Sequence, residues 1–371
     1  MVFAWAFLPE LLVEIMSYLS TPDLKSCALV KRSWNQEATR LLWHSIKLEV
    51  GIYGPAIEFI QAMHRFSDFF NALSREVWRA PYVRRLTIKM MVLLDDEVIL
   101  RSFATPQKFF TVSWKKIAHA LSLMHQLQHL ELKGSFPYSH RFVSAVCRAL
   151  SSAPIHTIHS CLEFTHVLGE YASWASSITS LIISSAVDYQ DVPHFPCLRF
   201  IASDQINMIT RFILSSPIEL FCFFGVTTTE TDLTMLANAV RVQASGKSTL
   251  RSIQVAQFIN EKILLQRFLS SLECPTLERV HLVLGAMEWS EPFNMADYAV
   301  ACLEATSSSI SHSLPTLRSL RFDIFNHRRD VVPSKRVHLK DTSSHLVTEA
   351  GFRLSTWLHQ RNHPPVGGYF T

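Results

Sequence analysis

A short pattern of apolar positions, apolar-x-x-apolar-x-apolar, recurs along most of the chain. Seven complete copies begin at Val83, Leu127, Ile178, Ile218, Leu250, Leu277 and Leu317, and two partial copies begin at Ile155 and Leu198. The second and third apolar positions are two residues apart, which places both side chains on one face of a β-strand, while the first position turns the chain inward. Each of the nine copies therefore predicts a strand.

Amphipathic helical segments lie between several of these copies, in residues 141–150, 232–244, 261–272 and 295–305. A strand, a turn and a helix repeated in this way are typical of a solenoid, in which neighbouring units bury a shared core. The pattern is similar to that of leucine-rich repeats. We therefore expect an α/β chain with an irregular, leucine-rich-repeat-like solenoid of parallel strands, which line its concave face.

Two features keep a compact α/β domain with a parallel sheet open as the alternative fold. The copies begin at intervals that vary from 20 to 44 residues. In addition, all nine copies lack the asparagine or cysteine that usually follows the third apolar position of a leucine-rich repeat. In regular repeats that side chain satisfies backbone groups along the bend, so loops or water would have to do so here.

Residues 8–48 carry a different pattern, which predicts three short helices. Leu8-Pro9-Glu10 begins the first helix, because proline suits the first helical turn. The apolar face of this helix is formed by Leu11, Leu12, Ile15, Met16 and Leu19. Thr21-Pro22-Asp23 begins the second helix, with a hydroxyl available to cap it and proline just inside.

A Ser-x-x-Gln capping box, Ser33 to Gln36, predicts the start of the third helix. One face of this helix is formed by Trp34, Ala38 and Leu41. Three such helices, built from about 40 residues, cannot form a self-sufficient core, so their apolar faces need another surface.

This N-terminal segment resembles the F-box, the motif by which adaptor proteins dock onto the Skp subunit of cullin-based ubiquitin ligases. The matching positions are Leu8, Pro9, Leu12, Ile15, Leu19, Leu24, Leu29, Val30, Trp34, Leu42 and Trp43. Lys31 departs from the pattern, since the family usually has a small serine or cysteine there, but its long stem can reach solvent. The resemblance implies contact with a Skp-type subunit through Leu8, Pro9, Leu12, Ile15, Leu19, Leu24, Val30 and Trp34.

An F-box followed by degenerate leucine-rich repeats resembles the large F-box families of fungi. This resemblance predicts an F-box domain (1–50), a helical linker (51–80), a repeat domain that binds substrate (81–325) and a basic C-terminal segment (326–371). It implies a substrate-recognition adaptor that binds a Skp-type subunit, through it a cullin, and an unknown protein substrate. The alternative is a non-ligase F-box scaffold that binds the Skp subunit alone.

Composition and charge limit which classes of partner and which cellular locations are expected. The seven cysteines lie far apart without any Cys-x-x-Cys pair, which argues against a disulfide framework or a zinc site and predicts reduced thiols in the cytosol or nucleus. The net charge of +4 resides in residues 325–371, with seven Lys/Arg against three Asp/Glu. We interpret this as a solvated segment and expect no nucleic acid. No stretch is apolar enough to predict a membrane span, so no membrane partner is expected.

Candidate catalytic residues lack the companions that catalysis needs. His125 and His129 have helical i, i+4 spacing but not the glutamate of a zinc protease, and His156 and His159 flank a predicted strand without evident partners. Asp95-Asp96-Glu97 are consecutive, so they cannot converge on one substrate atom. We therefore expect no enzyme activity, no metal and no cofactor. A hydrolase built on an α/β sheet is the enzyme alternative, for which the chain offers no nucleophile motif.

Substrate binding is predicted at the central strands. Strand residues between the apolar positions of the pattern point away from the core, and at the centre they are Ile182, Phe200, Leu220, Cys222 and Phe224. Towards the ends the equivalent residues are polar, namely Arg85, Thr87, Lys89, Arg279, His281 and Arg321. An apolar centre with a polar rim is typical of a protein-binding site, so the predicted substrate contacts are Ile182, Phe200, Leu220 and Phe224. Alternatively, an insertion or the segment from Val331 onward covers this patch.

Overall fold

The computed structural model describes residues 9–52, 56–92, 114–135, 139–162, 168–184, 194–224, 229–246, 248–258, 262–286, 314 and 316–326. Leu8, the helix expected at 295–305 and the segment 327–371 lie outside these residues. The chain divides into two units, Met1–Lys335 and Arg336–Thr371, and every element named below belongs to the first.

Three short helices form the N-terminal segment, as its apolar pattern predicts. They are α1 (Pro9–Ser17), α2 (Thr21–Val30) and α3 (Arg32–His44). The second helix has Pro22 in its first turn, and Ser20 rather than Thr21 is its cap, because the Ser20 hydroxyl accepts the backbone N–H of Asp23 at 3.4 Å.

The capping box predicted for the third helix does not form. Helix α3 begins at Arg32, so Ser33 lies inside the first turn, and Lys31 occupies the cap position without a side-chain cap. The side chain of Asn35 instead donates a hydrogen bond to the carbonyl of Ala28, near the end of α2, at 2.8 Å. This bond ties the start of α3 to the preceding helix.

The three helices share a small core of their own. Its buried members are Leu12, Met16, Leu24 and Ala38, and Leu19, Cys27, Ala28, Trp34, Leu41 and Leu42 pack against them. These residues form a cluster separate from the larger core beneath the sheet. So few buried side chains leave much of the apolar surface of α1 and α2 uncovered.

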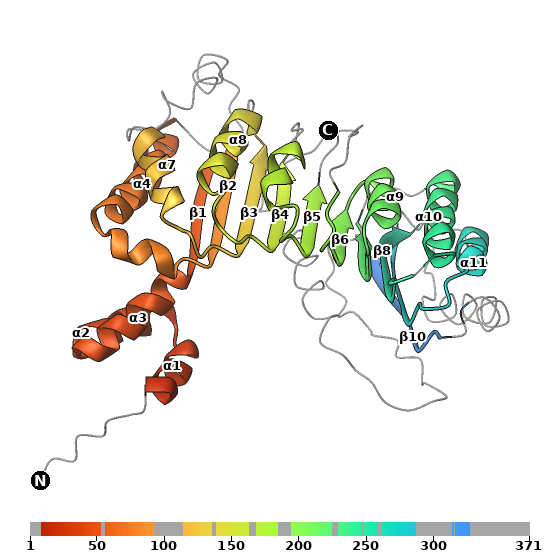
Figure 1. The fold of residues 1–371 in the computed structure, drawn as a ribbon, viewed down its shortest axis with the longest axis horizontal. Coiled ribbons are helices and arrows are strands. Elements are labelled where there is room, and N and C mark those ends of the chain that lie inside the picture. Colours follow the sequence, from red (N-terminus) through yellow and green to blue (C-terminus); the bar gives the residue numbers. More distant parts are fainter. Residues whose placement is uncertain are drawn as a thin grey trace, which may run out of the picture. The chain divides into compact units, whose positions relative to one another are not determined.

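In the described ranges, ten parallel strands follow, hydrogen-bonded in the order in which they occur along the chain. They are β1 (Ser45–Ile52), β2 (Arg85–Val92), β3 (His129–Ser135), β4 (Thr157–Leu162), β5 (Ser180–Ser184), β6 (Phe200–Ser203), β7 (Leu220–Phe223), β8 (Ser252–Phe258), β9 (Arg279–Ala286) and β10 (Ser319–Asn326). The nine copies of the apolar pattern fall on β2 to β10. The sequential order is that of an open, solenoid-like sheet, which confirms the predicted fold (Figure 1).

Strand β1 is a tenth strand that the sequence analysis did not predict. Trp43, Ile46 and Leu48 repeat the apolar spacing of the other units, but they overlap the end of the F-box motif. Trp43 also joins α3 to the next helices, since its ring stacks on Phe69, in residues 56–75, at 5.7 Å between centroids and lies beneath the guanidinium of Arg79, in residues 77–82, at 5.1 Å.

The segment 51–80, which the sequence predicts as a helical linker, includes in its described part the end of β1 and helix α4 (Ala56–Arg75). The 3-10 helix η1 (Val77–Tyr82) begins in this segment and ends just after it. Phe66, Phe70 and Leu73 of α4 are buried in the same core as Leu48 of β1. The apolar face of α4 therefore covers the first strand, as later helices cover later strands.

The helices cover one face of the sheet (Figure 1). Besides α4, they are α7 (Trp114–Ser122), α8 (Ser139–Ala149), α9 (Ile206–Ser215), α10 (Glu230–Ala244) and α11 (Lys262–Ser271), with the 3-10 helix η2 (Leu168–Trp174). Three of them match helices predicted from the sequence. Their buried side chains and the inward strand residues form one continuous core, so neighbouring units depend on each other for burial.

A ladder of backbone hydrogen bonds joins consecutive units just before their strands. The N–H groups of Gln128 and His129 both bond to the carbonyl of Arg84, at 2.9 and 3.0 Å, and those of Arg251 and Ser252 bond to that of Glu219, at 2.8 and 3.1 Å. Similar bonds link the intervening units. This ladder satisfies backbone groups at the turn without a repeated side chain, while the helical side of each unit can vary in length.

Candidate functional site

Five large apolar side chains in α1, in the turn that follows it and in α2 are exposed among the described residues. Leu11 is 44% exposed, Ile15 43%, Tyr18 82%, Leu29 88% and Val30 67%. We call these five residues the F-box apolar surface. Five exposed apolar side chains between residues 11 and 30 are more than the scattered exposure usual for a folded protein, and burying them against a partner would remove them from water.

The residues predicted to contact a Skp-type subunit fall into three groups. Ile15 and Val30 are exposed and belong to the F-box apolar surface. Leu12 and Leu24 are buried in the helical core, and Leu19 and Trp34 are half-buried against it. Pro9 is the first residue of α1, whereas Leu8 lies outside the described residues. Within this conformation, Ile15 and Val30 can touch a partner directly, while the buried residues position their helices.

Leu11, Tyr18 and Leu29 of the F-box apolar surface were not among the predicted contacts. Tyr18 and Leu29 lie near the ends of α1 and α2, where a simple count of helical periods gives little information about exposure. Leu29 was part of the family pattern, so the motif match was the signal that could have identified it. Lys31, the departure from that pattern, is exposed between α2 and α3.

The second candidate surface is the open face of the sheet, which we define as the strand side chains that point away from the helices. Ile182, Phe200 and Leu220 lie on this face and are half-buried. Phe200 and Leu220 are register partners on the adjacent strands β6 and β7. Ile182 of β5 is the register partner of Ala202, which is two residues after Phe200 on β6. The structure therefore brings three of the four predicted substrate contacts together.

Phe224 differs from the prediction, since it is buried and 3% exposed. Cys222 and Ala202, register partners on the open face, are each 1% exposed. For Phe224, burial of an aromatic ring removes a large apolar area from water. These three residues are thus unavailable at the surface in this conformation.

A network of polar side chains lies on the open face of β2, β3 and β4. The carboxylate of Glu131 accepts a hydrogen bond from the Thr87 hydroxyl at 2.7 Å and pairs with Lys133 Nζ at 2.6 Å and His159 Nδ1 at 2.8 Å. His159 Nε2 lies 3.1 Å from Cys161 Sγ. The expectation that His159 lacks a partner is therefore wrong: sequence spacing alone could not show that β3 aligns Glu131 opposite His159.

Electrostatics keep Glu131 ionised. Burial raises the pKa of its carboxyl, but hydrogen bonds from His159, Lys133 and Thr87 outweigh burial and hold the pKa well below the usual range. His129, on the same strand, has a lowered pKa because burial disfavours its charged form, which the attraction of Glu131 only partly offsets. The network is a fixed negative charge surrounded by donors.

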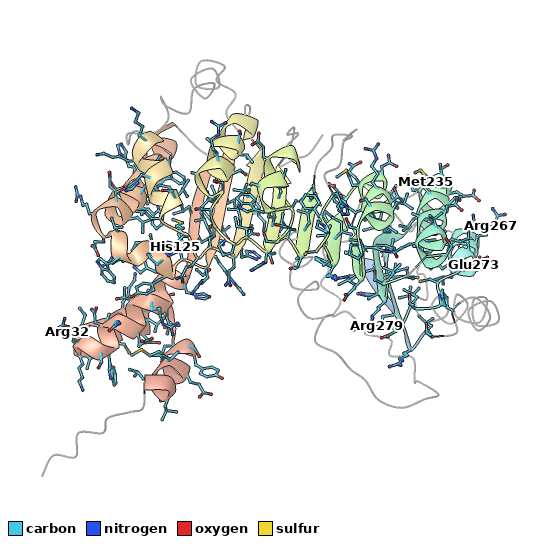
Figure 2. All side chains as sticks on the ribbon, in the orientation of Figure 1. Arg32, His125, Met235, Arg267, Glu273 and Arg279 are labelled. Atoms are coloured by element: carbon cyan, nitrogen blue, oxygen red, sulfur yellow. The ribbon has the colours of Figure 1, made fainter. Side chains whose placement is uncertain are left out.

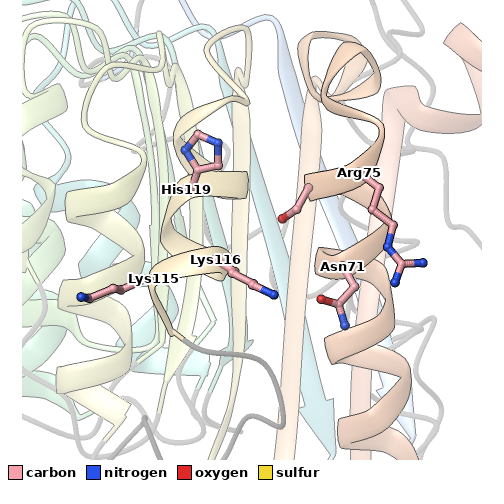
Figure 3. A pocket seen from close by; sticks show the side chains of 6 residues that line it. Asn71, Arg75, Lys115, Lys116 and His119 are labelled. Carbon is pink, nitrogen blue, oxygen red and sulfur yellow. The ribbon is translucent and has the colours of Figure 1, made fainter.

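A basic recess of about 490 Å³ lies between α4 and α7. It is lined by Asn71, Ser74, Arg75, Lys115, Lys116 and His119. Figure 3 shows Lys116 extending towards Asn71 on α4, whereas Lys115 extends away from that helix. The recess would attract an anionic group, but its cationic side chains are exposed and therefore weakly selective.

The described histidines and cysteines form no metal site. His125 is exposed in the turn between α7 and β3 (Figure 2), where its Nδ1 donates to the carbonyl of Leu123 at 3.0 Å. His156 Nδ1 donates to the carbonyl of Ser177 at 3.0 Å. Within the described ranges, no three His, Cys, Asp or Glu side chains are placed to hold a metal ion. The helices in the same ranges include none with the length and apolarity of a membrane span.

Comparison with known proteins identifies the N-terminal helices. Residues 6–49 match the family model described as F-box-like, which spans α1, α2, α3 and the start of β1. No curated protein matches the chain. The matched region contains the whole F-box apolar surface and its supporting core. The chain therefore carries an N-terminal F-box-like domain, which precedes a solenoid-like sheet of parallel strands.

Proposed function

We propose that this protein is a substrate-recognition adaptor of a Skp–cullin–F-box ubiquitin ligase. The observation that carries the proposal is the F-box apolar surface, which lies within the matched F-box-like region and is left uncovered by a core of four buried residues. A Skp-type subunit would bury these side chains. Binding of a Skp-type partner is the general property of F-box-like domains, whereas cullin recruitment and substrate capture are the specific parts of this proposal.

The adaptor would act by proximity. It would hold a substrate lysine near a ubiquitin-loaded enzyme recruited by the other ligase subunits, and so raise the effective concentration of the reacting groups. This role requires no catalytic group of its own, only two binding surfaces on one chain. The F-box-like domain supplies one surface, and the open face of the sheet is our candidate for the other.

Copurification distinguishes this function from its alternative, a scaffold that binds the Skp subunit alone. The full chain, tagged and expressed with Skp-type and cullin subunits, should purify with both and support ubiquitin transfer to captured proteins. Recovery of the Skp-type subunit without cullin, under conditions in which a known F-box protein recruits both, would favour the scaffold. Failure to recover the Skp-type subunit would contradict both functions.

The substrate would bind at the half-buried apolar residues Ile182, Phe200 and Leu220. Phe200 and Leu220 are register partners on adjacent strands, and neighbouring apolar anchors suit a protein or peptide ligand.

Phe200→Glu and Leu220→Glu are expected to abolish substrate capture while leaving the thermal midpoint within a few degrees. Each would place a charge where an apolar anchor should be desolvated, a loss of about 2 kcal/mol or more of binding energy. Affinity capture of ubiquitinated proteins, with the proteasome inhibited, measures the effect. Thr157→Glu is the matched control, since Thr157 is a half-buried residue in the same register row. A drop of many degrees in the melting temperature of the Phe200 and Leu220 variants would show that this patch is core.

A further inference from the structure

In the polar network on the open face, the side chains of a glutamate, a histidine and a cysteine contact one another in that order. Glu131 Oε1 lies 2.8 Å from His159 Nδ1, and His159 Nε2 lies 3.1 Å from Cys161 Sγ. Because the carboxylate can only accept, Nδ1 carries the proton and Nε2 is the nitrogen that faces the thiol. This is the arrangement in which a base, oriented by a third group, takes the proton of a nucleophile.

Neighbouring charges favour the same proton transfer. Lys133 is the register partner of Cys161 on the adjacent strand, so its cation lies on the same face as the sulfur. Thr87 and Lys133 fix the Glu131 carboxylate, which in turn stabilises an imidazolium at His159. His159 is 5% exposed, and water therefore competes poorly for its hydrogen bonds. A thiolate beside an imidazolium and a lysine is more stable than an isolated thiolate.

We propose that Cys161 is a reactive thiol, a modification site for peroxides and other soft electrophiles, activated by His159 and Glu131. The thiol proton moves to His159 Nε2, and the thiolate attacks one oxygen of hydrogen peroxide. A sulfur–oxygen bond forms as the oxygen–oxygen bond breaks, and the departing hydroxide takes the proton back from His159 to become water. Sulfur is oxidised by two electrons to a sulfenic acid, and the peroxide is reduced.

The pH dependence of this site follows from the groups that face it. They are Arg85 and Lys89 on β2, His129, Glu131 and Lys133 on β3, and Asp204, which accepts a hydrogen bond from Ser184 next to Cys161 at 2.7 Å. Cations outnumber carboxylates among them. The proposed thiolate should therefore persist to lower pH than an ordinary thiolate, and its reactivity should change little between pH 6 and pH 8.

Alkylation of the full chain by iodoacetamide, followed by peptide mass spectrometry, tests the proposal within one molecule. Cys197 is the internal control, because it is exposed whereas Cys161 is only partly exposed. At pH 6, Cys161 is expected to react on the order of ten times faster than Cys197, although access favours Cys197. Equal or slower alkylation of Cys161, with a steep rise in its rate towards pH 9, would overturn the proposal.

Variants separate activation from a merely structural network. His159→Gln and Glu131→Gln should each remove the rate advantage of Cys161 at pH 6, while continued protection of the buried Cys147, Cys222 and Cys274 from alkylation reports an intact fold. Treatment of the wild-type chain with hydrogen peroxide and a sulfenic-acid trap should label Cys161 before Cys197. If both variants fold and Cys161 keeps its rate, or if the trap labels both cysteines equally, the activation by His159 is refuted.

Discussion

Aspartate in place of both Ile15 and Val30 is expected to lower the affinity for a Skp-type subunit by about a thousand-fold. Both side chains belong to the F-box apolar surface. Truncating or charging a buried interface anchor typically costs about 2 kcal/mol or more, and two anchors together give roughly a thousand-fold change in Kd. Because both residues are exposed in the free chain, the same substitutions should change the free energy of unfolding by less than about 1 kcal/mol.

Two exposed apolar residues elsewhere provide matched controls for this experiment. Leu214 on α9 and Val242 on α10 are each 57% exposed. Leu214→Asp and Val242→Asp introduce the same charge outside the F-box-like domain, and should leave the Kd measured by calorimetry unchanged. The assignment of the docking surface fails if the Ile15 and Val30 double variant binds like the wild type, or if the two controls weaken binding as strongly.

Phe221→Ala is expected to destabilise the sheet by about 3–5 kcal/mol, the usual cost of removing a buried phenylalanine. Phe221 is fully buried, and its register partners Ile201 and Ile253 are fully buried on either side. Since one continuous core runs beneath the strands, we expect the variant to keep a single unfolding transition at a lower urea concentration. This outcome would support one cooperative unit over residues 81–325.

Hydrogen exchange during urea unfolding measures both the loss of stability and the number of unfolding transitions. Peptides from β2 to β4 and from β8 to β9 should lose protection together in the wild type and in the variant. Leu220→Ala is the control, because Leu220 is adjacent in sequence but half-buried on the open face. This variant should lose clearly less free energy of unfolding than Phe221→Ala. Two separate transitions, or a stable cut near Gly246 that releases two folded halves, would contradict a single unit.

The sequence alone determined nine of the ten strands and the solenoid-like order. A strand pattern depends on alternation over a few residues, and Val83-x-x-Leu86-x-Ile88 and its counterparts carry that signal locally. The F-box-like domain was equally readable, since the positions of Leu12, Leu24 and Trp34 form a motif in one short segment. Trp43 belongs both to the F-box motif and to the apolar pattern that precedes a strand. Because the motif accounted for Trp43, strand β1 was not predicted.

Only the tertiary structure decided which apolar residues are covered and which distant polar residues meet. Helical spacing marks Leu12 and Ile15 alike as apolar, but packing of α3 against the earlier helices buries Leu12 and leaves Ile15 exposed. Glu131 and His159 are far apart in the chain, and the parallel register of β3 and β4 brings them together. Burial and long-range pairing depend on how elements pack, and local periodicity does not encode that packing.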